Sequence, residues 1–231
     1  MKVTIDDIVK YTFCPNFFRL NGEISTTSSS LHSKLQELVL YTLRREFELE
    51  TKTTWKQVLD KWIRLFWLDT EDSPASQTLF NKSQIGIKKF FNWYIELPLT
   101  PLALKFNLNG TIGNHQVISE VPFILQKEDG TVACVFMESA GSVDDALRSH
   151  RIVCTSHLMN SEIAVSQIFN ISFTSKNTFS VVSVFPTERF WDRAHSELYG
   201  VLTSMQNDFY YMNSSSCGGC ILRKECSDML A

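Results

Sequence analysis

The sequence predicts an α/β fold with a helical insertion, because helices come first, antiparallel strands follow, and a helix, a strand and a last helix end the chain. Apolar residues recur at helical spacing through residues 30–96, whereas residues 104–139 alternate with the two-residue period of strands. A chain of 231 residues buries about 70% or more of its extended surface, so its core needs no metal. We expect one domain over residues 1–231, with residues 30–96 inserted into it.

The first part of the chain is predicted to be mostly helical. Residues 1–20 indicate a short helix that has Asp6 and Asp7 near its start. Residues 73–97 indicate a longer helix, which the stretch "LPLTP" ends. Two further helices are indicated by apolar residues at helical spacing, namely Leu31, Leu35, Leu38 and Leu43 in one and Trp55, Leu59, Trp62 and Leu65 in the other.

The middle of the chain predicts an antiparallel β-meander. The stretches "LKFNLNG", "HQVISEVPFIL" and "TVACVFMES" have the composition of strands. Asp129 and Gly130 separate the last two stretches, and this dipeptide is typical of a hairpin turn.

The remainder returns to helices. Residues 142–169 predict one helix, and the tandem Asp144 and Asp145 begin or cap it. The stretch "NTFSVVSVFP" predicts another strand, and residues 188–211 predict a last helix. That helix leads directly into a group of cysteines.

Three of the six cysteines are concentrated in "SCGGCILRKEC" near the C-terminus. Cys217, Cys220 and Cys226 follow a Cys-x2-Cys-x5-Cys pattern, which is dense enough to indicate metal ligands. Three thiols are one short of a tetrahedral site. Cys14, in "YTFCPNFF", is the candidate for the fourth ligand, because the proline after it bends the chain away from helix.

The other two cysteines are expected to be structural. Cys134 lies inside the apolar stretch "VACVF", and Cys154 follows "RIV" in a predicted helix, so both should pack as small hydrophobic residues. The four remaining thiolates suit zinc and iron equally, and spacing alone leaves both metals open. A clasp that closes a loop of about two hundred residues would contribute on the order of 5 kcal/mol to stability in a chain-entropy model.

The combination of "Y..CP..F" near the N-terminus and the C-terminal cysteine pattern resembles the iron–sulfur branch of the PD-(D/E)XK nuclease superfamily, which includes CRISPR adaptation exonucleases and AddB-type subunits of helicase–nucleases. The resemblance implies a central mixed sheet flanked by helices. It also implies a [4Fe-4S] cluster that joins the two ends of the chain and is held by Cys14, Cys217, Cys220 and Cys226. The stretch "SLHSKL" matches the family helix that carries a metal-binding histidine, which maps onto His32.

The resemblance weakens at the catalytic hairpin. The family uses an Asp and a Glu-x-Lys to hold a divalent metal and orient the nucleophile. The match places Pro122 at the aspartate and Ala140 at the lysine, and it leaves Glu138 alone. On a regular strand Glu120 would share a face with Pro122, so His32, Glu120 and Glu138 are the residues that a rearranged site would use.

Composition limits nucleic-acid binding to a local patch, because the formal net charge is −3. Trp93 and Tyr94 lie near a pair of lysines, as stacking on single strands would require, although their helical spacing favours core packing. The basic candidates for a nucleic-acid patch are Lys88, Lys89, Arg148, Arg151, Arg223 and Lys224.

The sequence favours a cytoplasmic protein. No apolar run approaches the roughly 18 residues that span a bilayer. "MKVTIDDIVKYTF" has aspartates where a signal peptide would be apolar, and clustered cysteines in the cytosol more often bind metal than form disulfides.

The leading functional hypothesis is therefore a catalytically inactive PD-(D/E)XK-like protein that carries an iron–sulfur cluster. By resemblance, such members serve as structural subunits that hold a DNA end or dock to a helicase or polymerase complex. The alternatives are an active metal-dependent DNA exonuclease with a rearranged site and a zinc-clasped protein-interaction domain without a role in nucleic-acid binding.

Overall fold

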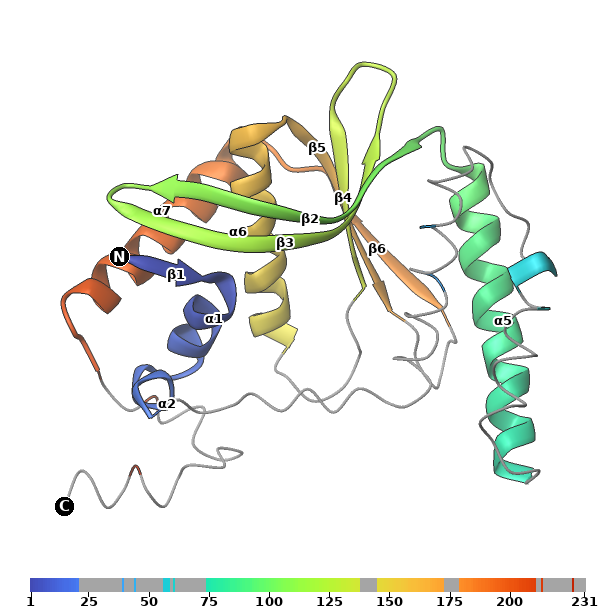
Figure 1. Cartoon of the computed structure of the whole chain (residues 1–231), viewed down its shortest axis with the longest axis horizontal. Coiled ribbons are helices and arrows are strands. Elements are labelled where there is room, and N and C mark those ends of the chain that lie inside the picture. The colour runs from blue at the N-terminus through green and yellow to red at the C-terminus, as the bar shows by residue number, and fades with distance from the viewer. Residues whose placement is uncertain are drawn as a thin grey trace.

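The computed structural model describes residues 1–20, 74–137, 145–172 and 179–210, together with residues 39, 44, 56–58, 60, 213 and 226. The strands are β1 (Lys2–Thr4), β2 (Thr100–Ile112), β3 (His115–Gln126), β4 (Val132–Met137), β5 (Val165–Ser172) and β6 (Ser180–Val184). The helices are α1 (Ile5–Phe13), α2 (Pro15–Arg19), α5 (Pro74–Glu96), α6 (Asp145–Glu162) and α7 (Glu188–Gln206). Together they form a mixed sheet flanked by helices (Figure 1). None of the described helices is long and apolar enough to cross a membrane.

Strand β3 is the centre of the sheet. It pairs antiparallel with β2 along its whole length. The first part of its other side pairs in parallel with β1, where Val3 lies opposite Val117. The last part of that side pairs antiparallel with β4, where Phe123 lies opposite Val135. β4 and β5 are parallel, and β5 and β6 are antiparallel. The mixed sheet that the resemblance implied is therefore present.

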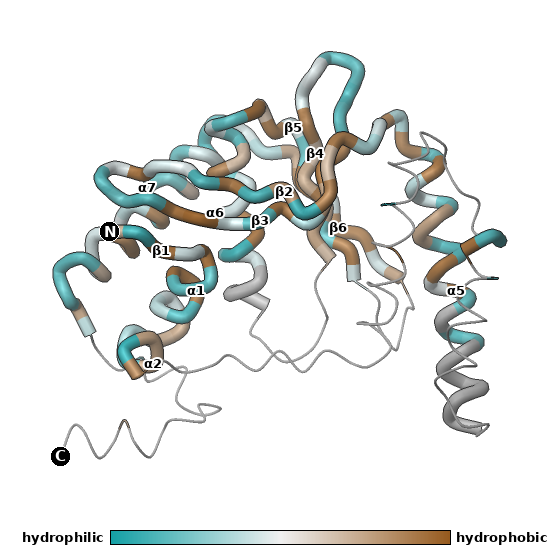
Figure 2. Tube along the Cα trace, in the orientation of Figure 1, coloured by the Kyte–Doolittle hydropathy of each residue, from teal (hydrophilic) through white to brown (hydrophobic). Residues whose placement is uncertain are grey.

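The two faces of the sheet are covered by different helices. α1, α6 and α7 bury one apolar cluster against the first face, with Ile8, Leu158 and Leu198 fully buried. α5 buries a second, aromatic-rich cluster against the other face through Phe90 and Tyr94. Figure 2 shows the apolar residues concentrated along the strands between these helices.

Part of the predicted helical insertion joins the second cluster. α5 covers most of the predicted helix at residues 73–97. Val39 and Val58, from the two other predicted helices, are helical and buried in the same cluster. Apart from residues 39, 44, 56–58 and 60, residues 21–73 lie outside the described residues.

The β-meander and its turn are confirmed. Gly130 has a φ of 83°, which glycine adopts readily, and Thr131 N–H donates to Asp129 Oδ1 at 2.9 Å.

The prediction of one helix over residues 142–169 is wrong in its last part. α6 begins at Asp145, as the aspartates indicated, but it ends at Glu162 and β5 follows. The run "VSQIF" is buried between β4 and β6, and this tertiary pairing decides its conformation.

The β2–β3 ribbon turns sharply midway along its length (Figure 1). Residues two apart on a strand normally share a face. Here Val121 packs into the cluster under α6, whereas Phe123 packs into the cluster under α5. Lys105 lies opposite Pro122 at this point and has a left-handed φ of 51°, which is uncommon for a residue with a side chain. Both strands therefore exchange their faces at Lys105 and Pro122.

We expect Lys105→Gly to leave the free energy of unfolding unchanged or to raise it by up to about 1 kcal/mol, because glycine adopts the left-handed region without strain. Asn107→Gly is the matched control on the same strand, at a regularly paired position opposite Glu120. It should lower the free energy of unfolding by about 0.5–1 kcal/mol. Urea denaturation measures both, and equal destabilisation by the two variants would contradict the assigned backbone strain.

Two histidines are partly buried where α6 meets its neighbouring helices. His157 Nε2 lies 3.2 Å from His195 Nδ1 of α7, and His150 Nε2 lies 3.3 Å from Thr12 Oγ1 of α1. Burial lowers the pKa of His150, with an opposing effect from Glu197, and burial together with the charge of His195 lowers the pKa of His157.

This arrangement predicts that stability falls on acidification. The unfolded chain takes up protons on these histidines near pH 6.5, whereas the folded chain takes them up only at lower pH, so the stabilisation is complete above about pH 6.5 and declines below it. The variant His150→Gln/His157→Gln should lose less stability than the wild type between about pH 7.5 and pH 5 in urea denaturation. An unchanged pH dependence would contradict the role of these two groups.

Candidate functional site

The corner between α1 and α2 holds a buried cysteine. α1 begins with a capping box, in which Thr4 Oγ1 accepts the N–H of Asp7 at 3.1 Å and Asp7 Oδ2 accepts the N–H of Thr4 at 2.9 Å. It ends at Cys14, whose backbone is extended with φ −164° and ψ 120°, because Pro15 follows and disfavours helical backbone before it. Pro15 begins α2, and Cys14 is buried at the corner between the two helices.

The C-terminal part of the chain meets this corner. The backbone N–H of Asn213 donates to Cys14 Sγ at 3.4 Å, and Asn213 Nδ2 donates to the carbonyl of Phe13 at 2.9 Å. Cys226 is also buried, and Asn16 Nδ2 donates to Cys226 Sγ at 3.8 Å. Cysteines from opposite ends of the sequence therefore lie at the same corner.

Aromatic contacts fix the approach of this segment. The hydroxyl of Tyr11 donates to the carbonyl of Phe209, just after α7. The Tyr11 ring also makes edge contacts with Phe18 and Tyr210, at centroid distances of 5.9 and 6.2 Å. The Arg19 guanidinium lies 5.7 Å from the centre of the Tyr210 ring, which adds a cation–π contact. These contacts join α1 and α2 to the chain beyond α7.

The chemistry of this corner fits a thiolate-bound group. Amide N–H groups commonly hydrogen-bond to the sulfur atoms of metal–thiolate centres, and Cys14 and Cys226 each accept such a hydrogen bond. Cys217 and Cys220 lie outside the described residues, so the four-cysteine set remains a prediction. Within the described parts of the chain, no three His, Cys, Asp or Glu side chains are grouped so that they could hold a metal ion.

The two structural cysteines behave as predicted. Cys134 on β4 and Cys154 on α6 are both almost completely buried. Burial raises the pKa of each thiol to about 12, so both remain protonated at neutral pH. Neither is suited to be a ligand or a nucleophile.

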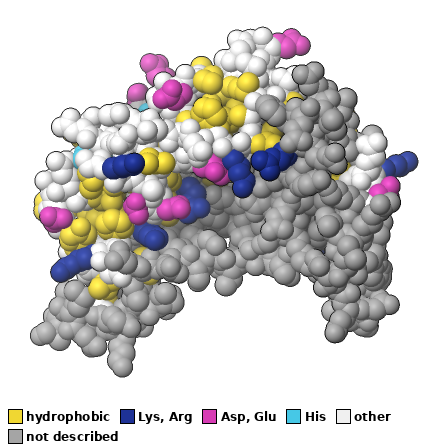
Figure 3. All heavy atoms as spheres, in the orientation of Figure 1, with side chains coloured by type: hydrophobic (Ala, Val, Ile, Leu, Met, Phe, Trp, Pro, Cys, Tyr) yellow, Lys and Arg dark blue, Asp and Glu magenta, His cyan; other side chains and the backbone are white. Residues whose placement is uncertain are grey.

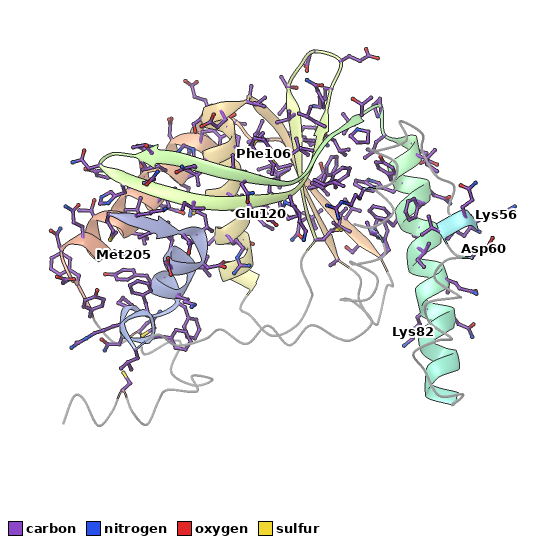
Figure 4. The ribbon with its side chains drawn as sticks, in the orientation of Figure 1. Lys56, Asp60, Lys82, Phe106, Glu120 and Met205 are labelled. Carbon is purple, nitrogen blue, oxygen red and sulfur yellow. The ribbon has the colours of Figure 1, made fainter. Side chains whose placement is uncertain are left out.

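The candidate catalytic strand is β3. Glu120 is exposed on the β2–β3 ribbon, opposite Asn107 (Figure 4). The regular alternation that would place Glu120 and Pro122 on one face does not hold, because β3 exchanges its faces at Pro122. His32 and Glu138, the other members of a rearranged site, lie outside the described residues, and so does Ala140.

The structure also brings together a polar pair that the sequence analysis did not single out. Thr155 of α6 is buried against β3, where its Oγ1 lies 2.8 Å from Ser119 Oγ. Ser156, the next residue on α6, is also buried. Adjacent hydroxyl residues on the apolar side of a predicted helix are the sequence signal for such a buried contact.

The basic candidates are dispersed. Lys88 and Lys89 are exposed on α5. Arg151 forms an ion pair with Asp6 of α1 at 2.7 Å, so its charge is partly compensated. The side chains of Arg148, Arg223 and Lys224 lie outside the described residues. Figure 3 shows Lys and Arg interspersed with Asp and Glu on the viewed face, rather than a single basic stripe over the described surface.

The aromatic residues near Lys88 and Lys89 belong to the core. Tyr94 is fully buried, and its ring stacks on the Phe90 ring with the two ring centroids 6.1 Å apart. Trp93 is half-buried and makes an edge contact with Phe169 of β5 at 5.2 Å. The core interpretation of these rings is confirmed, and Tyr94 has no exposed face on which a base could stack.

Comparison with known proteins bears on the fold. No protein-family model and no curated protein matches the chain. Among solved structures, the "Putative exonuclease" of Eubacterium rectale matches with a TM-score of 0.52 and 9% identity, over 96% of this chain and 86% of that one. A protein designated SSO0001 matches with a TM-score of 0.48 and 10% identity, over 100% and 87% of the two chains. LHK-Exo in complex with dAMP matches with a TM-score of 0.35 and 10% identity, over 100% and 95%.

The chain has a nuclease-like fold. The Eubacterium rectale structure carries this conclusion together with the mixed sheet between two helical layers. At such low identity the likeness concerns the fold alone. Function has to be argued from the residues at the α1–α2 corner and on β3.

The predicted four-cysteine metal site implies that Cys14→Ser contains less metal than the wild type and that its free energy of unfolding is lower by roughly 2–5 kcal/mol, because the metal would no longer join the two chain ends. Cys154→Ala is the matched control, since it removes an equally buried thiol that is distant from the corner in sequence. It should keep the metal and cost about 1 kcal/mol. Metal analysis and urea denaturation measure these effects, and full metal content in Cys14→Ser would rule out Cys14 as a ligand.

Proposed function

We propose that this protein is a catalytically inactive nuclease-like module that carries a [4Fe-4S] cluster and binds nucleic acid or assembles with a protein partner in the cytoplasm. The observation that carries the proposal is the central strand β3. At the position where the resemblance places a metal-binding aspartate, the strand has Pro122 and exchanges its faces. A carboxylate pair that holds a catalytic metal would need a neighbouring acid there.

Cys14, Cys217, Cys220 and Cys226 would hold the cluster. Two of these sulfur atoms lie at the α1–α2 corner and accept hydrogen bonds from Asn213 and Asn16. When bound, the cluster supplies covalent bridges between the two chain ends. Thiolate ligands suit both iron and zinc, so the preference for iron rests on the family resemblance alone.

Binding of nucleic acid is proposed from the fold and from Lys88 and Lys89. Both side chains are exposed, whereas the apolar side of α5 is buried. The net charge of −3 limits the affinity, so the module would act together with a partner such as a helicase or polymerase complex.

The first test separates an inactive module from an exonuclease with a rearranged site. Protein purified without oxygen is analysed for iron, sulfide and zinc, and then incubated with labelled single and double strands and manganese. We expect iron and sulfide, and no cleavage above that of the Glu138→Ala variant. Cleavage by the wild type that Glu138→Ala abolishes would establish the exonuclease, and zinc without sulfide would establish the zinc-clasped domain.

The second test concerns nucleic-acid binding. Affinity for a single strand should fall as salt is raised, and the variant Lys88→Ala/Lys89→Ala should reduce the slope of log affinity against log salt by about 1.4 if both lysines contact phosphates. The variant Lys2→Ala/Lys127→Ala has the same change of charge elsewhere on the surface and serves as control. Equal slopes for the two variants would exclude α5 as the nucleic-acid surface.

A further inference from the structure

Three described strands, β1, β2 and β6, each have a single described partner strand, and the two longer ones, β2 and β6, differ in their protection against pairing with another chain. β2 forms one edge, and it carries Pro101, the left-handed Lys105 and an irregularity between Pro101 and Ala103. Prolines, lysines and bulges are the features that keep an edge strand from pairing with another chain. β6 lies at the far end of the strand order, and among the described residues only β5 pairs with it.

β6 has none of these protective features. Its sequence "SVVSV" contains no charge, proline or glycine. Val182 is 57% exposed and Val184 is 39% exposed, and Phe185 immediately after the strand is 65% exposed. The Lys127 ammonium, in the β3–β4 turn, lies 5.9 Å from the centre of the Phe185 ring.

Val182 and Val184 lie on the same face of the sheet as α6, which covers this face at β2, β3 and β5. Val184 is paired with Ile168, which is buried in the cluster under α6, and Val182 is paired with Asn170. Directly paired residues of antiparallel strands share a face. α6 packs on β2, β3 and β5, so the apolar side of β6 is left at the surface.

We propose that β6 pairs antiparallel with β6 of a second copy of this chain. An edge of this kind offers backbone N–H and C=O groups beside apolar side chains, and the ligand that fits it is an uncharged, apolar strand. β6 is itself such a strand. When the pairing is centred on Ser183, Val182 of each copy lies opposite Val184 of the other copy on the same face of the sheet, and no charged residues face each other. The two sheets then form one continuous sheet across a two-fold axis.

The pairing is expected to be weak. Five residues and one flanking phenylalanine bury less surface than the roughly 1,200 Å² of a stable interface, which places this contact among transient ones. Pairing through β6 requires neither the metal cluster nor nucleic-acid binding.

Sedimentation velocity over a wide range of protein concentration tests the proposal on the full-length protein. The wild type should form dimers as concentration rises. Val182→Lys/Val184→Lys should raise the dissociation constant at least about tenfold, because it sets like charges opposite each other. The control Asn109→Lys/Thr111→Lys, at two exposed positions of the β2 edge, should dimerise like the wild type.

Two further measurements separate pairing from misfolding. Mixing Val182→Lys/Val184→Lys with Val182→Glu/Val184→Glu should restore dimers through opposite charges. In the wild type, hydrogen exchange of the backbone amides in residues 181–184 should slow as concentration rises. A monomer at every concentration, or a dimer that the β6 variants leave intact, would overturn the proposal, and a monomeric wild type would point to a different protein as the strand donor.

Discussion

The contact between the two ends of the chain is the constraint on which the rest of the structure depends. The Tyr11 hydroxyl donates a hydrogen bond to the Phe209 carbonyl, beyond α7. The Phe13 carbonyl and the Cys14 sulfur each accept a hydrogen bond from Asn213. α1 also packs against both α6 and α7. The first helix thus ties the C-terminal segment to the layer that covers one face of the sheet, and a thiolate-bound group at this corner would reinforce a junction that already exists.

The β2–β3 ribbon is irregular at Lys105 and Pro122, beside the position at which the family resemblance expects a metal-binding aspartate. In a regular ribbon, side chains on neighbouring strands keep one face and can converge on a metal. The exchange of faces at Lys105 and Pro122 instead directs residues on either side of it into two different apolar clusters. The exchange therefore serves packing, since it lets one ribbon contribute to both cores.

The same division of the sheet explains its exposed edge. α6 covers the first face as far as β5, and α5 covers the second face. Val181 on β6 packs toward the α5 cluster, whereas Val182 and Val184 face the side where helical cover ends. An apolar strand is thus half in the core and half at the surface, which is the arrangement that favours pairing with another strand.

Sequence alone determined the elements whose pattern is local. Helical spacing identified α5 and α7, and alternation and Asp129-Gly130 identified the β2–β3–β4 meander. The proline after Cys14 indicated a bend away from helix where α1 ends, although one short helix was predicted over residues 1–20 and the structure has β1, α1 and α2 there. The burial of Cys134 followed from its apolar neighbours for the same reason. These features depend on residues within a few positions of one another.

Tertiary structure alone decided what depends on distant partners. The run "VSQIF" became β5 because β4 and β6 lie on either side of it, although the sequence continued a helical pattern. The meeting of Cys14 with Asn213, the ion pair of Arg151 with Asp6 and the exchange of faces at Pro122 also require chain segments that no local pattern relates. Burial and pairing energies between such segments outweigh local propensity, and they become visible only once the chain is folded.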